Sequence, residues 1–86
     1  MSYQLIDPGE SLDFAFDWSL WLAEGDSIST RQWTIEPTGP TLTGATSATV
    51  KVSGCTLGIV YRLAEDVVTA NGVSGKRSIT LRCDLR

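Results

Sequence analysis

The sequence contains no histidine, only two cysteines and only three prolines among its 86 residues. Without histidine the chain lacks the commonest general base and the commonest metal ligand, which excludes a Ser-His-Asp triad and a histidine-ligated zinc site. No apolar run approaches 18 residues, so we expect neither a membrane-spanning helix nor a membrane partner. We therefore expect a protein that is not an enzyme and that has no catalytic, cofactor-binding or metal-binding residues.

Positive charge is also scarce, because seven lysines and arginines face ten acids and leave a net charge of -3. Nucleic-acid binding needs a basic face, so we expect no nucleic-acid partner. The N-terminal residues lack the basic start and the apolar centre of a signal peptide. We therefore expect a product that is made and kept in the cytoplasm, or assembled there into something larger.

A chain of this length forms one domain that buries only roughly 60–65% of its unfolded surface. Domains this small often gain stability from a crosslink or from partner subunits. The apolar fraction of 42% and the charged fraction of 20% are typical of a folded globular domain.

Short stretches in which apolar and polar residues alternate recur along the chain, with turns every 8–12 residues. They cover residues 12–18, 28–35, 41–44, 48–53, 61–68 and 79–85. A two-residue period is typical of half-buried strands, and no amphipathic helix of useful length is present. The pattern predicts an all-β fold, an immunoglobulin-like antiparallel β-sandwich of about seven strands.

Two places depart from regular alternation. Three consecutive apolar residues at 20–22, followed by Gly25, predict a short helical crossover near residues 18–24. Ile28 and Trp33 differ in parity, which predicts a β-bulge near residues 30–31.

Residues 1–10 are expected to form an N-terminal extended arm, separated by a turn at residues 7–9 from a sandwich domain at 11–86. The arm carries Tyr3, Leu5 and Ile6. We predict that these three side chains pack on an adjacent subunit, so that deleting residues 2–8 blocks assembly without unfolding the domain.

Residues 14–28 hold both phenylalanines and two of the three tryptophans. Aromatic residues dominate the buried area of small domains, so Trp18, Trp21 and Trp33 are expected in the core or capping it. Two alternatives remain: the tryptophans stack against sugars, or Trp18 and Trp21 anchor a subunit interface.

Two residues of the 61–68 stretch have an ambiguous role. Tyr61 is either a tyrosine corner, bonded to the backbone of the preceding loop, or an ordinary strand aromatic. The parity of Glu65 points inward, which requires either a place near an open end of the sandwich or a bulge that turns it out. The other acids lack the spacing of a calcium loop and are expected on the solvated surface.

The two cysteines, Cys55 and Cys83, are too few for a disulfide framework. The dipeptide Asn71-Gly72 predicts a hairpin, and our expected register across it puts Arg62 opposite Cys83. The loop carrying Cys55 enters at the same place, so the two thiols can approach bridging distance. The cytoplasm keeps protein thiols reduced, so we expect both cysteines to be buried and reduced. A Cys55–Cys83 disulfide and a disulfide between subunits are the alternatives.

One long motif and two shorter ones carry a resemblance to a known family. The long motif reads Phe16-Asp17-Trp18-Ser19-Leu20-Trp21-Leu22-Ala23-Glu24-Gly25-Asp26-Ser27-Ile28. The shorter ones read Gly58-Ile59-Val60-Tyr61-Arg62-Leu63 and Arg77-Ser78-Ile79-Thr80-Leu81-Arg82. Over residues 11 to 83 the chain resembles a group of small immunoglobulin-like virion proteins of tailed phages, which includes fiber–tail adaptors and minor structural proteins.

The resemblance implies a non-enzymatic structural component of a tailed bacteriophage particle, at the neck or head–tail connection or as a fiber–tail adaptor, carried in multiple symmetric copies. The implied partners are other virion proteins: neck, tail, portal or capsid subunits. The implied location is the virion, after assembly in the cytoplasm of the bacterial host. A capsid decoration protein and a carbohydrate- or host-surface-binding module are the alternatives.

Overall fold

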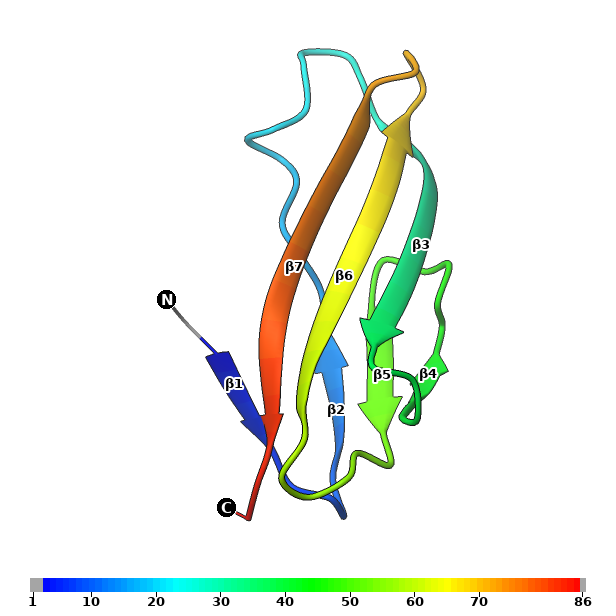
Figure 1. Cartoon of the computed structure of the whole chain (residues 1–86). Helices are drawn as coiled ribbons and strands as arrows, with labels where there is room; N and C mark the ends of the chain where they lie inside the picture. The colour runs from blue at the N-terminus through cyan, green and yellow to red at the C-terminus, as the bar shows by residue number, and fades with distance from the viewer. Residues whose placement is uncertain (1–2, 86) are drawn as a thin grey trace.

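The computed structural model describes residues 3–85, which form seven β-strands and no helix. The strands are β1 (Tyr3–Ile6), β2 (Ser11–Phe14), β3 (Ile28–Glu36), β4 (Thr41–Thr43), β5 (Val50–Ser53), β6 (Val60–Thr69) and β7 (Ser74–Cys83). A four-stranded sheet in the order β1-β7-β6-β3 packs against a three-stranded sheet in the order β2-β5-β4 (Figure 1). The predicted all-β sandwich is confirmed.

The core between the sheets follows from the alternation within the strands. In β5, Val50 and Val52 are buried while Lys51 between them is exposed. From the larger sheet, Trp33 of β3 and Leu63 of β6 complete the same cluster. Each sheet therefore covers the apolar face of the other, as a sandwich requires.

The two sheets differ in length, which shapes the molecule. Strands β6 and β7 have ten residues each, whereas β2, β4 and β5 have three or four. The smaller sheet covers only the lower half of the larger one, in the orientation of Figure 1, and the segment 15–27 (the Trp loop) lies over the upper half. The domain is elongated, 43 × 25 × 17 Å.

The Trp loop is not helical, so the predicted helical crossover near residues 18–24 is wrong. It consists of turns, in which the N–H groups of Trp21 and Leu22 both donate to the Trp18 carbonyl, at 3.0 and 3.1 Å. Strand β2 also ends at Phe14 rather than continuing to Trp18. A helical nucleus of so few residues is unfavourable, and contacts of the Trp18 and Trp21 side chains with the larger sheet determine the conformation instead.

The expected separation of an arm at residues 1–10 needs correction for the part that the structure describes; residues 1 and 2 lie outside it. Strand β1 is an edge strand of the larger sheet, parallel to β7, with Ile6 opposite Cys83. The Ile6 side chain is completely buried in the core. Deleting residues 2–8 should therefore uncover the core rather than remove a free arm.

The hairpin β6–β7 forms as predicted, but in another register. Arg62 lies opposite Thr80, not opposite Cys83. The register of β3 against β6 shifts between Ile28 and Thr30, one or two residues from the place where a bulge was predicted. Within residues 3–85, no helix is long and apolar enough to cross a membrane.

Candidate interaction surfaces

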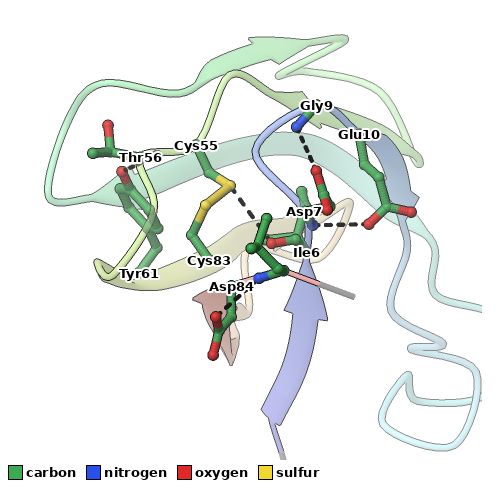
Figure 2. Close-up of a disulfide and its surroundings, with 10 residues drawn as sticks. Ile6, Asp7, Gly9, Glu10, Cys55, Thr56, Tyr61, Cys83 and Asp84 are labelled. Atoms are coloured by element: carbon green, nitrogen blue, oxygen red, sulfur yellow. Dashed lines mark hydrogen bonds between the residues drawn. A yellow bond between two sulfur atoms is a disulfide. The ribbon is translucent and has the colours of Figure 1, made fainter.

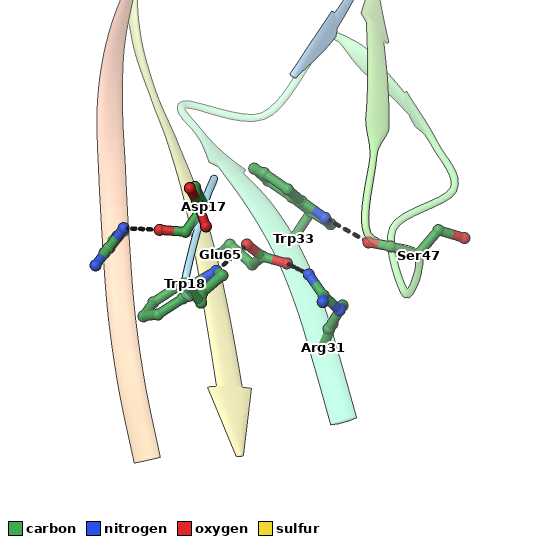
Figure 3. A network of polar contacts seen from close by, with 7 residues as sticks. Asp17, Trp18, Arg31, Trp33, Ser47 and Glu65 are labelled. Atoms are coloured by element: carbon green, nitrogen blue, oxygen red, sulfur yellow. Dashed lines mark hydrogen bonds and ion pairs between the residues drawn. The ribbon is translucent and has the colours of Figure 1, made fainter. Parts of the chain in front are cut away.

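A buried carboxylate holds the Trp loop on the larger sheet (Figure 3). Glu65 of β6 has no solvent exposure. The indole Nε1–H of Trp18 donates to its Oε1 at 2.7 Å, and Nη1 of Arg31 donates to its Oε2 at 3.0 Å. Because a buried charge is tolerated only when it is paired and hydrogen-bonded, these contacts tie the loop to two strands. The role of Glu65 was left open by the sequence; in the structure no bulge turns it out, and its side chain is buried beneath the Trp loop.

Arg77 of β7 makes two further contacts with the Trp loop. Its guanidinium lies 4.5 Å from the centre of the Trp18 ring, a cation–π contact. Its Nη1 also donates to the backbone carbonyl of Asp17. Hydrogen bonds from the Ser19 hydroxyl and backbone N–H lower the pKa of Asp17. Trp18 is thus enclosed by its own chain, with 4% of its surface exposed.

Trp21 rests on β7 at a position without a side chain. A Cβ at Gly75 would lie 2.6 Å from the Trp21 ring, too close for any real contact. Trp21 also meets Trp18 edge to face, with ring centres 5.0 Å apart. Gly75 therefore provides the seat for Trp21, which remains half-buried.

The end of the Trp loop is fastened to the turn between β6 and β7. The Ser27 carbonyl accepts a hydrogen bond from the Ala70 N–H at 2.9 Å, and Asp26 Oδ1 accepts one from the Asn71 N–H at 3.3 Å. Desolvation acts to raise the pKa of Asp26, but hydrogen bonds outweigh it. The donors are the Thr69 hydroxyl and the N–H groups of Ser27 and Asn71, so the net shift is downward.

One apolar side chain projects from this well-anchored loop. Leu20 is 98% exposed, more than any other large apolar residue that the structure describes. Val73, in the β6–β7 turn at the same end, is also exposed. The loop carries three acids and no base, and Asp17 and Glu24 among them are exposed. An exposed apolar side chain on a loop that is already fixed would lose little conformational freedom if a partner covered it.

A second group of exposed apolar side chains lies at the lower end, opposite the Trp loop. It comprises Leu57, Ile59, Val60 and Leu85. The loop 54–59 is held there by two backbone hydrogen bonds to Cys83: Gly58 N–H to the Cys83 carbonyl at 2.9 Å, and Cys83 N–H to the Ile59 carbonyl at 3.1 Å.

Cys55 and Cys83 form a disulfide at this lower end, which corrects the expectation that both are reduced (Figure 2). Their Cα atoms lie 6.0 Å apart, within the usual range for a disulfide. The proximity expected from the topology is present, although it arises from the pairing of Ile59 with Cys83 and not from the predicted hairpin register.

Tyr61 stabilises the same loop. Its hydroxyl oxygen accepts a hydrogen bond from the backbone N–H of Thr56 at 3.0 Å, and its ring is buried. The tyrosine-corner interpretation of Tyr61 is therefore confirmed in its essential contact, a bond to the backbone of the preceding loop.

The predicted docking residues differ in their exposure to solvent. Ile6 and Trp18 are buried in their own chain, so neither side chain is free to contact a partner. Tyr3 is exposed, and Leu5 and Trp21 are half-buried, so docking through these three stays a prediction. Leu20, which lies between the two tryptophans in sequence, was not among the predicted docking residues, although it belongs to the run of three apolar residues at 20–22.

The third tryptophan belongs to the core. Trp33 is buried, stacks on Phe16 with ring centres 5.5 Å apart, and donates its indole N–H to the Ser47 carbonyl at 2.8 Å. With Trp18 also enclosed, neither ring presents a free face for a sugar. Among residues 3–85 no three Cys, Asp or Glu side chains converge as a metal site would require.

The arrangement defines a class: a small immunoglobulin-like sandwich, with exposed apolar side chains both on the Trp loop and at the lower end. Its fold matches the solution structure of the PKD domain from KIAA 1837 protein, with a TM-score of 0.76 and 17% identity over 98% of this chain and 81% of that one. This likeness shows the fold alone.

The chain belongs to the phage family described as Podophage GP4 fiber-tail adaptor protein gp77, whose model matches residues 7–82. It is therefore a structural protein of a tailed-phage particle, in a family of fiber–tail adaptors. Among curated proteins, no sequence matches this chain.

Proposed function

We propose that this chain is a non-enzymatic adaptor that joins a fiber protein to the tail or neck of a podophage particle by docking a different partner at each end. The family match supports the adaptor role. The observation that carries the proposal is that exposed apolar side chains occur in two separate places, Leu20 on the Trp loop over the upper half of the larger sheet and Leu57 in the loop at the lower end. An adaptor needs two separate surfaces, and an elongated domain separates them.

The chain acts in multiple symmetric copies, because tails and necks are built on rotational symmetry and closed rings repeat each contact. It is assembled into the particle in the cytoplasm of the bacterial host. Its net charge of -3 supports protein partners rather than nucleic acid.

Complementation tests the proposal. A phage lacking the gene is grown on hosts that supply the wild-type chain, Leu20→Asp or Leu57→Asp, and purified particles are analysed by quantitative mass spectrometry. We expect one variant to be absent from particles and the other to be present in particles that lack fibers, since each change disrupts one partner. Thr34→Asp, an exposed change in the middle of β3, is the control and should behave as wild type.

Two results contradict the proposal in different ways. Absence of the wild-type chain from particles rules out a virion adaptor. Normal particles with normal fibers from both leucine variants rule out docking through the two ends.

A further inference from the structure

The Cys55–Cys83 disulfide lies where three parts of the fold meet: the loop 54–59, the end of β7 and the end of β1. Cys55 is 7% exposed and Cys83 is completely buried. Cys83 lies opposite Ile6 of β1, and the Cys55 Sγ is 3.7 Å from the Ile6 carbonyl oxygen (Figure 2). The bond thus fastens the loop that carries Leu57 to the end of β7.

Contacts without sulfur already place this loop. The Gly58–Cys83 and Cys83–Ile59 backbone hydrogen bonds and the bond from Thr56 N–H to Tyr61 are independent of the disulfide. The fold therefore brings the two sulfurs together before they are joined.

The reduced form is also compatible with the same surroundings. A Cys55 thiol has a proton to donate to the Ile6 carbonyl at the observed 3.7 Å, whereas a disulfide sulfur has none. The site accommodates two thiols or one disulfide with little rearrangement.

The compartment selects between these two forms. Phage chains are synthesised in the bacterial cytoplasm, where glutathione and thioredoxin keep thiols reduced, whereas the medium that receives released particles is oxidising. Resting on the adaptor function above, we propose that the chain enters the particle with Cys55 and Cys83 as thiols and that the disulfide closes after release from the host. Closure then locks the lower docking end in a particle that must survive outside the cell.

The chemistry of closure needs an oxidant from the medium. The two S–H bonds break, one S–S bond forms, and two protons and two electrons pass to dissolved dioxygen, which becomes hydrogen peroxide. Alternatively, a low-molecular-weight disulfide in the medium accepts them by thiol–disulfide exchange and leaves as two thiols. The slightly exposed Cys55 is the sulfur that such a reagent reaches first.

Thiol counting on the wild-type chain tests the proposal. Infected cells before lysis and particles after release are precipitated with acid to stop exchange, dissolved in denaturant with N-ethylmaleimide, and analysed by mass spectrometry. We expect two adducts per chain before lysis and none in released particles. No adducts before lysis, or two in released particles, overturn the proposal.

Two further measurements test the cause and the consequence of closure. In a host whose thioredoxin and glutathione reductases are inactive, we expect no adducts even before lysis; two adducts there contradict control by the compartment.

A Cys55→Ala/Cys83→Ala chain should be incorporated at the wild-type copy number but be lost from heated released particles several-fold faster. Equal retention overturns the locking role. If the chain is absent from released particles, the adaptor function is contradicted. That result differs from a wrong number of adducts on a chain that is present, which contradicts only the closure of the disulfide.

Discussion

The indole N–H of Trp18 donates a 2.7 Å hydrogen bond to Glu65, 47 positions further along the chain and completely buried. This contact holds a loop over the half of the larger sheet that the smaller sheet does not reach. It also explains why a charged residue occupies an inward position of β6, where alternation alone favours an apolar one. The exposed Leu20 is presented on a loop that this hydrogen bond fixes.

Replacing Trp18 by Phe should destabilise the domain by about 1–3 kcal/mol, because the buried Glu65 oxygen loses its donor. Urea unfolding of wild type, Trp18→Phe, Glu65→Leu and the double variant forms a double-mutant cycle, in which each single change removes one partner of the hydrogen bond. We expect a coupling energy above about 0.5 kcal/mol between the two sites. Strict additivity would show that the hydrogen bond contributes nothing to stability.

Gly75→Ala should displace the Trp loop, since the new Cβ lies 2.6 Å from the Trp21 ring. Overpacking of this kind costs about 1–3 kcal/mol. Tryptophan fluorescence should shift to longer wavelength, because Trp21 is pushed toward solvent. Gly9→Ala is the matched control, where the nearest atom is an ordinary 3.5 Å away. Equal effects of the two changes contradict a specific seat for Trp21.

Much of the sandwich could be predicted because its signals are local. The alternation of Val50 and Val52 with Lys51 appears directly in the sequence, and so does the turn at Asn71-Gly72. The role of Tyr61 could also be predicted, because the tyrosine-corner hydrogen bond joins it to a loop only a few residues away. Such features require no knowledge of what lies across the fold.

The features that were missed depend on contacts between distant segments. Strand β1 joins β7 in parallel, with more than half of the chain between them, and no local pattern distinguishes it from a free arm. The conformation of the Trp loop depends on Glu65 and Gly75, which lie about 50 residues further along the sequence, in β6 and β7. The disulfide was judged by compartment, a property of the cell, whereas the fold alone decides that the two sulfurs meet.

Acid should weaken the attachment of the Trp loop through Asp26. The pKa of Asp26 is lower in the folded state than the ordinary value of 3.8. The stabilisation is therefore complete above that value and is lost as the pH falls through the folded pKa. Urea unfolding at a series of pH values below about 5 should show this decline.

Asp26→Asn removes the titrating group, so the variant should have a flatter stability profile in this range. Glu24→Gln, an exposed change in the same loop, leaves the Asp26 contribution in place. A profile for Asp26→Asn as steep as that of wild type would falsify the assignment.

Reducing the disulfide should lower the free energy of unfolding by about 3–4 kcal/mol, since the bond closes a loop with a sequence separation of 28 residues. Urea unfolding with and without dithiothreitol measures the difference. The Cys55→Ala/Cys83→Ala variant should be insensitive to the reductant, which separates the bond from any general effect of thiols. If wild type is equally insensitive, the bond does not contribute to stability.

Tyr61→Phe removes the acceptor for the Thr56 N–H while keeping the buried ring. An unsatisfied backbone donor costs about 1–3 kcal/mol when it is buried and less when water can reach it, so we expect a loss near the lower value. The loop 54–59 should also open more often, and hydrogen exchange of the Thr56 amide should accelerate. Because this loop positions Cys55 beside Cys83, reoxidation of the reduced variant in a glutathione buffer should be slower than in wild type. Thr56→Ala retains the backbone N–H and should reoxidise at the wild-type rate; equal rates for all three chains would mean that the tyrosine does not position the cysteine.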